Sequence, residues 1–392
     1  MKHFIKRFYL YCLMLMTMSS CIDEYKLPSS DTEAMVVIFG QIVEESECIF
    51  TLRSTATPTG QLEIYSYIRN AKIQVRGTDG QVFEGKLKNE EKAQYEVSVG
   101  KLDPAQKYYV HVSTPYGDFE SEPMQPLDAP GIVDLYYEQP RDDKKVDIMV
   151  STQDPQGLCY LLWQVDEYWE IRTPYSSRWT YQVEPGEDPY DDKAKGHYVL
   201  LTSDQYTNHG WRHETNLTDF ATNEDYANGA ITKRCICQRD HLDHRFQNRC
   251  LVRVKQMAIS KEEYEYRNLM LNQTSNVGDL FSQMPTELPT NIISLGQTKG
   301  IGYIGVRGRT STMEMYINGS DVDYKSTDHP STLPSDKVYA SPNRMMLEGY
   351  SIFSHNPDTG ETIWTFAWCV DYHDNYWNGT DAMERPDFWK DK

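Results

Sequence analysis

The chain has 392 residues, with 39 basic side chains against 58 acidic ones and a formal net charge of −19 at pH 7. Nucleic-acid binding needs a basic face, and no Lys/Arg cluster appears, so a nucleic-acid partner is excluded. The length exceeds what one hydrophobic core usually supports, so we expect two domains.

The first 20 residues have the three-part layout of a secretory signal: a basic start, an apolar run over residues 8–18, and the small residues Ser19 and Ser20. The apolar run is too short to span a bilayer as a helix. The Ser19-Ser20-Cys21 ending resembles the bacterial lipobox. We therefore predict that residues 1–20 are removed and that Cys21 anchors the mature chain to the outer membrane through its lipid.

Asp23 and Glu24 follow this cysteine directly. Such acids resemble the surface-export signal of lipoproteins in Bacteroidota, which predicts an outer-membrane lipoprotein that faces the cell exterior. The alternative is that they only belong to a solvated tether, and residues 21–33 serve as a flexible tether under either interpretation.

Six cysteines remain once Cys12 and Cys21 are set aside. An even number in an exported chain favours disulfides, although the sequence does not define their pairing. The candidates are Cys48, Cys159, Cys235, Cys237, Cys250 and Cys369.

Short strand-like segments fill residues 34–127. Residues 35–43 are rich in β-branched side chains, and residues 71–76 alternate apolar with polar ones before an Asp79-Gly80 hairpin turn. Several such strands, separated by turn signals, predict an N-terminal immunoglobulin-like β-sandwich.

Three prolines and a glycine in residues 123–131 cannot continue a strand ladder, so a second domain is expected over residues 128–392. Strand patterns at 159–171 and 362–370 each place large apolar side chains on one face, which we expect in a core. In the first of these strands Glu167 shares that face. The sequence therefore predicts an all-β protein whose second domain is larger and β-rich.

One inserted helix is expected in this larger domain. Ser260 can cap it, with Glu263 three residues further on, which is the pattern of a capping box.

The polar, aromatic stretches 173–195 and 203–230 do not fit a regular element, and loops of that length are often functional. Trp179, Tyr181 and Tyr190 lie in the first stretch and are candidate contacts for a glycan, a small nutrient or a partner barrel. The alternative is that these rings fold back onto their own domain.

No catalytic residue, metal or cofactor is predicted. Thiolates and imidazoles in residues 235–244, with Cys250, suit zinc or copper, but Cys-x-Cys is not a standard structural-zinc spacing. The sequence contains no Gly-x-Ser-x-Gly, no His-Glu-x-x-His and no EF-hand loop, so a non-enzymatic role is expected.

Taken together, these segments resemble the Bacteroidota lipoprotein family catalogued as domain of unknown function 4249. The resemblance rests on the strand at 36–43, the hairpin at 108–123, the helix at 260–266, the segment 291–305 and the terminal Arg-Pro-Asp-Phe-Trp at 385–389. Relatives often have a second cysteine near the last strand, whereas Cys369 stands alone in that region.

The resemblance implies a surface lipoprotein, often encoded beside a TonB-dependent transporter, with no known catalytic residue or ligand. The function expected is that of an accessory or ligand-binding partner of such a nutrient transporter. The alternatives are an independent surface adhesin or glycan-binding lipoprotein and, with least support, a hydrolase.

Overall fold

A computed structural model describes residues 35–55, 65–140, 144–154, 159–275, 289–333, 338, 340–377 and 381–391. The predicted signal and tether, with Cys21, Asp23 and Glu24, lie outside these residues. Strands dominate the described chain, which confirms the all-β prediction. Within these described ranges the α-helices are α2 (Lys261–Ser275) and the short α3 (Pro342–Leu347), and neither is long and apolar enough to cross a membrane.

The N-terminal sandwich consists mainly of one continuous sheet that folds into two layers around a core containing Phe50, Val75 and Phe119, with a separate two-stranded sheet beside it. Gly80, at φ +89°, supports the predicted turn between β5 and β6. The N-terminal strands of the sandwich are β1 (Val36–Phe39), β2 (Gln41–Val43), β3 (Ser46–Thr55), β4 (Tyr65–Tyr67), β5 (Lys72–Gly77), β6 (Val82–Asn89), β7 (Gln94–Val99), β8 (Tyr108–Thr114) and β9 (Gly117–Ser121).

Three strands from far along the chain complete this sandwich. β18 (Ile292–Ser294) pairs with β9, while β19 (Gly300–Ile301) and β20 (Gly305–Arg307) run parallel to β1 and β2. Gly302 has φ +141°, and a Cβ there would lie 2.1 Å from the carbonyl oxygen of Ile38, so only glycine fits. The sandwich is therefore not formed by residues 34–127 alone, and this returning segment does not belong to the larger domain.

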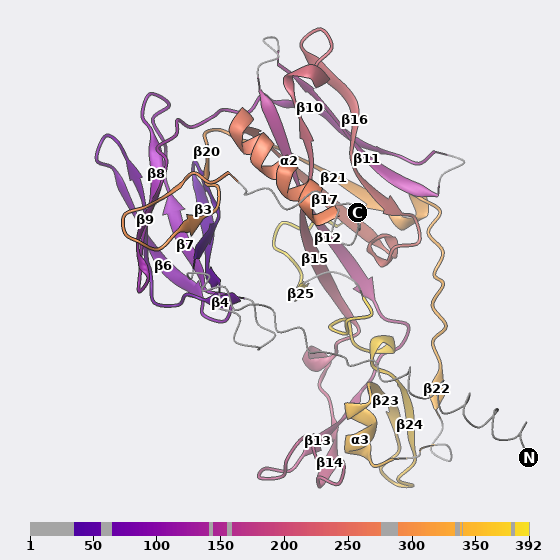
Figure 1. Cartoon of the computed structure of the whole chain (residues 1–392). Helices are drawn as coiled ribbons and strands as arrows, with labels where there is room; N and C mark the ends of the chain where they lie inside the picture. The colour runs from indigo at the N-terminus through magenta and orange to yellow at the C-terminus, as the bar shows by residue number, and fades with distance from the viewer. Residues whose placement is uncertain are drawn as a thin grey trace, which may run out of the picture.

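The central domain consists of two further sheets packed face to face (Figure 1). Trp163, Val165, Trp169 and Ile171 lie in the core between them, as predicted for that strand. One sheet contains β10 (Ile132–Glu138), β11 (Lys145–Gln153) and β16 (Ala230–Asp240), and the other β21 (Ser311–Asn318), β17 (Arg249–Ile259), β12 (Tyr160–Arg172), β15 (His209–Ala221) and β25 (Asp381–Met383).

The outer face of the five-stranded sheet is also covered. Tyr264 of α2 packs on Leu162, and Trp389, near the C-terminus, packs on Trp211. The backbone N–H of Glu263 donates to the Ser260 hydroxyl at 3.1 Å, which confirms Ser260 as the helix cap. The Glu263 carboxylate accepts from Arg267 and Arg307 instead, so the second half of the predicted capping box is not formed.

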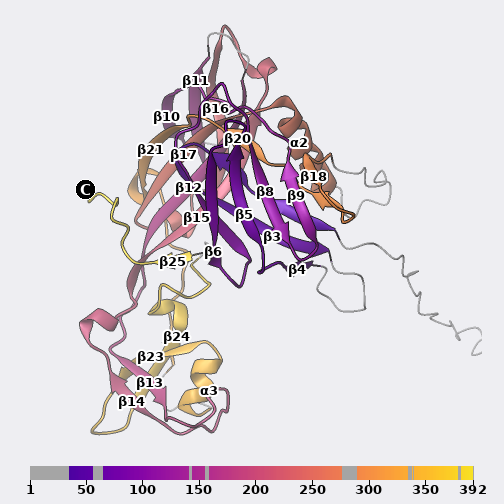
Figure 2. The ribbon, with the colours of Figure 1, turned by 90° about the vertical axis from the view of Figure 1, so that its left-hand side faces the viewer.

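The remaining elements form a small distal lobe at one end of the molecule (Figures 1 and 2). The chain enters this lobe twice, once between β12 and β15 and once between β21 and β25. The lobe has its own core around Met345, Ile352 and Trp364. Its elements are α3 and the strands β13 (Trp179–Val183), β14 (Gly196–Leu200), β22 (Thr332–Leu333), β23 (Tyr350–His355) and β24 (Thr362–Phe366).

The predicted strand at 362–370 ends early. β24 stops at Phe366, and residues Ala367–Cys369 form the 3-10 helix η6. Trp364 is buried in the lobe core, whereas Phe366 is exposed and Trp368 packs against the central domain. The expected single apolar face of this segment is thus divided between two parts of the molecule.

Candidate binding surfaces

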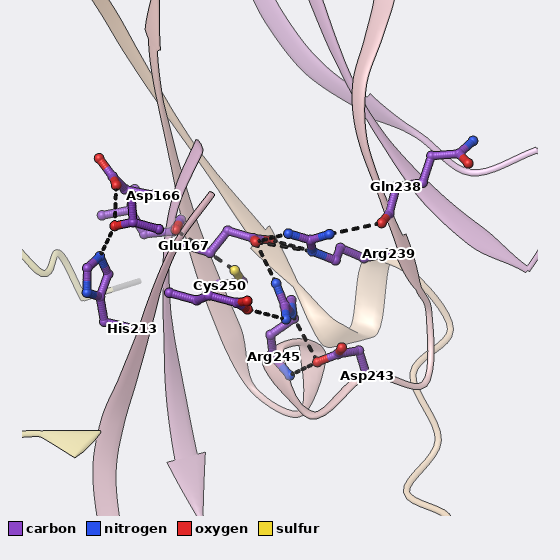
Figure 3. A network of polar contacts seen from close by, with 11 residues as sticks. Asp166, Glu167, His213, Gln238, Arg239, Asp243, Arg245 and Cys250 are labelled. Atoms are coloured by element: carbon purple, nitrogen blue, oxygen red, sulfur yellow. Dashed lines mark hydrogen bonds and ion pairs between the residues drawn. The ribbon is translucent and has the colours of Figure 1, made fainter. Parts of the chain in front are cut away.

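A buried polar network of the central domain surrounds Glu167 (Figure 3). Its side chain on β12 accepts hydrogen bonds from Arg239 of β16 at 2.6 Å and from Arg245 at 2.5 Å. Arg245, in the 3-10 helix η3 (His244–Phe246), also pairs with Asp243 at 3.0 Å and Glu214 at 2.9 Å.

This network is closed. Burial alone would lower the pKa of Arg245, but the carboxylates of Glu167 and Asp243 raise it well above its usual value. Glu167, Arg239 and Arg245 leave no buried polar atom without a partner in the described chain. The cluster therefore joins the two sheets of the central domain.

The structure corrects the expected disulfides, because all six candidates are thiols. Cys48 lies in the core of the sandwich, whereas Cys159, Cys237 and Cys250 belong to the central core and Cys369 to η6. Cys235 shares strand β16 with Cys237. Cys48, Cys237, Cys250 and Cys369 are buried, and burial raises the pKa of Cys48 to about 11 and of Cys237 to about 12.

The Cys/His stretch at 235–244 does not converge on one point. In the β16–β11 ladder Cys235 lies opposite Met149 and Cys237 lies opposite Ile148. His241 Nδ1 lies 2.7 Å from the carbonyl oxygen of Lys144, and His244 faces Asp328. Within the described ranges, no group of three or more His, Cys, Asp and Glu side chains is placed to hold a metal.

A second polar cluster lies where the lobe joins the central domain. His244 Nε2 lies 3.2 Å from Asp328, and the Tyr376 hydroxyl donates to the same carboxylate at 2.5 Å. Trp368 stacks on Tyr376 with ring centroids 4.4 Å apart. Burial would raise the pKa of Asp328, but the hydrogen bond from Tyr376 contributes most to holding it below its usual value.

This junction cluster joins the two ends of the second excursion into the lobe, since Asp328 lies between β21 and the lobe and Tyr376 lies between the lobe and β25. η3 therefore contacts the central core through Arg245 and the lobe connections through His244. In the sequence His244 stands out only as part of the Cys/His stretch, and nothing points to Asp328 or Tyr376, because no local pattern connects three residues so far apart.

Two of the three predicted aromatic contacts fold back onto the lobe. Trp179 packs edge-on against His355 at 5.0 Å, and Tyr181 packs edge-on against Tyr198 at 5.4 Å. Tyr190 is 81% exposed. The structure thus supports the alternative interpretation for Trp179 and Tyr181 and leaves Tyr190 as a surface ring.

Further apolar side chains are exposed on the same lobe, namely those of Leu200, Met346, Leu347 and Phe366. The lobe is also acidic, because residues 173–205 and 338–371 contain four Lys/Arg against ten Asp/Glu. Exposed apolar side chains on an acidic, projecting lobe suit contact with another protein, and the charge disfavours an anionic lipid surface.

These features define an all-β protein made of two packed β-sandwich units and a distal lobe. The model of the family described as "Domain of unknown function (DUF4249)" matches residues 22–313, and the chain belongs to this family. The match ends within β21, so the second part of the lobe lies beyond it.

No curated protein gives a match to the chain. A solved structure titled "Complete structure of manganese lipoxygenase of Gaeumannomyces graminis and partial structure of zonadhesin of Komagataella pastoris" is 9% identical, covering 59% of this chain and 91% of that one. Its TM-score is 0.14, which supports no inference about fold or function.

Proposed function

We propose that this protein is a non-enzymatic outer-membrane lipoprotein of the Bacteroidota. Its lipid is carried by Cys21, and the protein faces the cell exterior. There it serves as an accessory or ligand-binding partner of a TonB-dependent nutrient transporter. The signal pattern of residues 1–20, the acids Asp23 and Glu24 and the family membership support this proposal.

The distal lobe is the part of the molecule that contacts the transporter in this proposal. It is inserted into the β12–β15 and β21–β25 connections, has its own small core and projects from the end of the central domain (Figure 2). Inserted loops on a rigid scaffold commonly carry binding functions. Tyr190, Leu200 and Phe366 of the lobe are exposed to water. Contact with a partner would remove their apolar surface from water, which is favourable.

An independent surface adhesin or glycan-binding lipoprotein is the second candidate. The single observation in its favour is Tyr190, because a freely exposed aromatic ring can stack on the face of a sugar.

Native purification of the tagged protein from outer membranes in mild detergent tests the proposal. We expect a TonB-dependent barrel to copurify in stoichiometric amount. A Cys21→Ala variant should lose its lipid and leave the membrane fraction. A protein that copurifies with no barrel would favour the independent binder, and an unlipidated wild-type protein would contradict the localisation.

A further inference from the structure

A groove of about 470 Å³ opens on the central domain, beside the segment that leads to the lobe. It is formed by the end of β10, the start of β11, the turn after β16 and residues 323–327. This volume is in the range of small-ligand sites. Its lining residues are Gln139, Pro140, Lys144, His241, Leu242, Asp323, Lys325 and Thr327.

The imidazole of His241 is the fixed polar group of this groove. Its side chain is nine-tenths buried, and the Lys144 carbonyl accepts from both its backbone N–H at 3.0 Å and its Nδ1 at 2.7 Å. A carbonyl oxygen only accepts, so Nδ1 bears the proton, and in the neutral ring Nε2 is then an acceptor. No hydrogen bond to Nε2 is formed within the described chain, so a hydroxyl in the groove can donate to it.

Two ammonium groups, of Lys144 and Lys325, border the same groove, together with the carboxylate of Asp323. Lys144 forms no salt bridge with a described carboxylate. Lys325 lies 3.4 Å from Asp323, with both side chains about three-quarters exposed, so this pair is weak and can exchange for another carboxylate.

The remaining lining supplies one more acceptor and a small apolar wall. The Gln139 amide nitrogen donates to the carbonyl of Val322 at 3.0 Å, which leaves its own side-chain oxygen to accept from a ligand. Leu242 and Pro140 offer apolar surface beside these polar groups. Hydroxyl acceptors, cations and an apolar wall together fit a compact polyhydroxylated anion.

We propose that this groove binds a sugar acid. Lys144 and Lys325 hold its carboxylate, the Nε2 of His241 and the side-chain oxygen of Gln139 accept from its hydroxyl groups, and Leu242 lies against its ring. This site goes beyond the proposed function, because binding requires no transporter.

Calorimetry with the purified full-length lipoprotein and glucuronate tests the site, with glucose as the neutral comparison. We expect glucuronate to bind at least about tenfold more tightly than glucose. Lys144→Ala and Lys325→Ala should each weaken glucuronate binding by about tenfold and leave the melting temperature unchanged, since both side chains are exposed. Lys72→Ala, an exposed lysine of β5, is the matched control and should bind as the wild type does.

A His241→Asn variant isolates the imidazole acceptor. The asparagine amide N–H can keep the bond to the Lys144 carbonyl, but the Nε2 acceptor is lost, so glucuronate affinity should fall by about fivefold or more. If this variant does not fold, the Lys144→Ala and Lys325→Ala variants still test whether the groove binds glucuronate. Equal affinity for glucose and glucuronate would overturn the proposal, and so would unchanged glucuronate affinity in both lysine variants. The absence of glucuronate binding at concentrations up to about 10 mM would overturn it as well.

Discussion

Arg307 of β20 donates a hydrogen bond to Glu263 in the first turn of α2, and both side chains are almost completely buried. Because β20 pairs with β2 of the sandwich, this ion pair ties the sandwich to the helix of the central domain. Arg267 adds a second bond to Glu263 at 2.8 Å. Gly305 permits the close approach, since a Cβ there would lie 2.2 Å from Glu263 Oε2.

Replacement of Arg307 by Met should strongly destabilise the protein. It would leave the buried Glu263 carboxylate with Arg267 alone, and the loss of one partner of a buried pair typically costs about 3–5 kcal/mol. We expect this loss in the free energy of unfolding measured with urea. The double variant E263Q/R307M should recover part of it, because the uncompensated charge is removed. A cost for R307M within about 0.5 kcal/mol, the range of an ordinary surface substitution, would contradict this account.

The same pair predicts a pH dependence. Burial alone would raise the pKa of Glu263, but Arg307 and Arg267 outweigh it, so the pKa in the folded state lies below the ordinary value of 4.5. A lowered folded-state pKa stabilises the protein fully above pH 4.5, and this stabilisation is lost as the pH falls through the lower value.

The wild type should therefore exceed E263Q in unfolding free energy at pH 7, with the difference narrowing below pH 4.5. Urea unfolding of both proteins between pH 7 and pH 3 measures this directly. A difference that stays constant across that range would show that Glu263 is not stabilised as a carboxylate.

The cysteine chemistry gives a third prediction. After denaturation without reductant, a thiol reagent should titrate all six cysteines from Cys48 to Cys369. In the native protein at pH 8, Cys48 should react very slowly, because with a pKa of about 11 only about one molecule in a thousand has the thiolate. Fewer than six titratable thiols, together with a melting temperature that falls on reduction, would restore the disulfide interpretation.

The lobe should unfold separately from the rest of the molecule. Trp364→Ala removes the largest side chain of its small core, at a cost of about 3–5 kcal/mol. Because that core is distinct from the central one, amide exchange should rise in β13, β23 and β24 and stay unchanged in β12. Phe366→Ala, at a side chain exposed on the same strand, is the control and should alter exchange little. Faster exchange in β12 to the same extent would mean that lobe and central domain form one cooperative unit.

The sequence predicts local features well where the cause is local. Alternation and the Asp79-Gly80 turn give the hairpin of β5 and β6, and Ser260 with Glu263 gives the start of α2. Strand β15 is missed because it contains buried polar groups such as Arg212, whose Nε donates to the Tyr372 carbonyl at 3.1 Å. Its polar sequence reads as a loop although its backbone is paired on both sides.

Long-range assembly could not be predicted in the same way. β20 is only three residues long, and nothing in its residues indicates a parallel partner near the N-terminus. The lobe is built from two distant insertions, so neither contains its whole core. For this reason Trp179 and Tyr181 read equally well as ligand contacts or core, and only the ring contacts with His355 and Tyr198 decide between them.

The most direct test of the central claim is site-specific photo-crosslinking in intact cells. A photoreactive phenylalanine analogue replaces Tyr190 on the lobe or, as the matched control, the exposed Tyr116 on the sandwich. We predict that the Tyr190 position crosslinks to a TonB-dependent barrel and that the Tyr116 position does not. A barrel captured only from Tyr116, or from neither position, would contradict the claim that the distal lobe contacts a transporter.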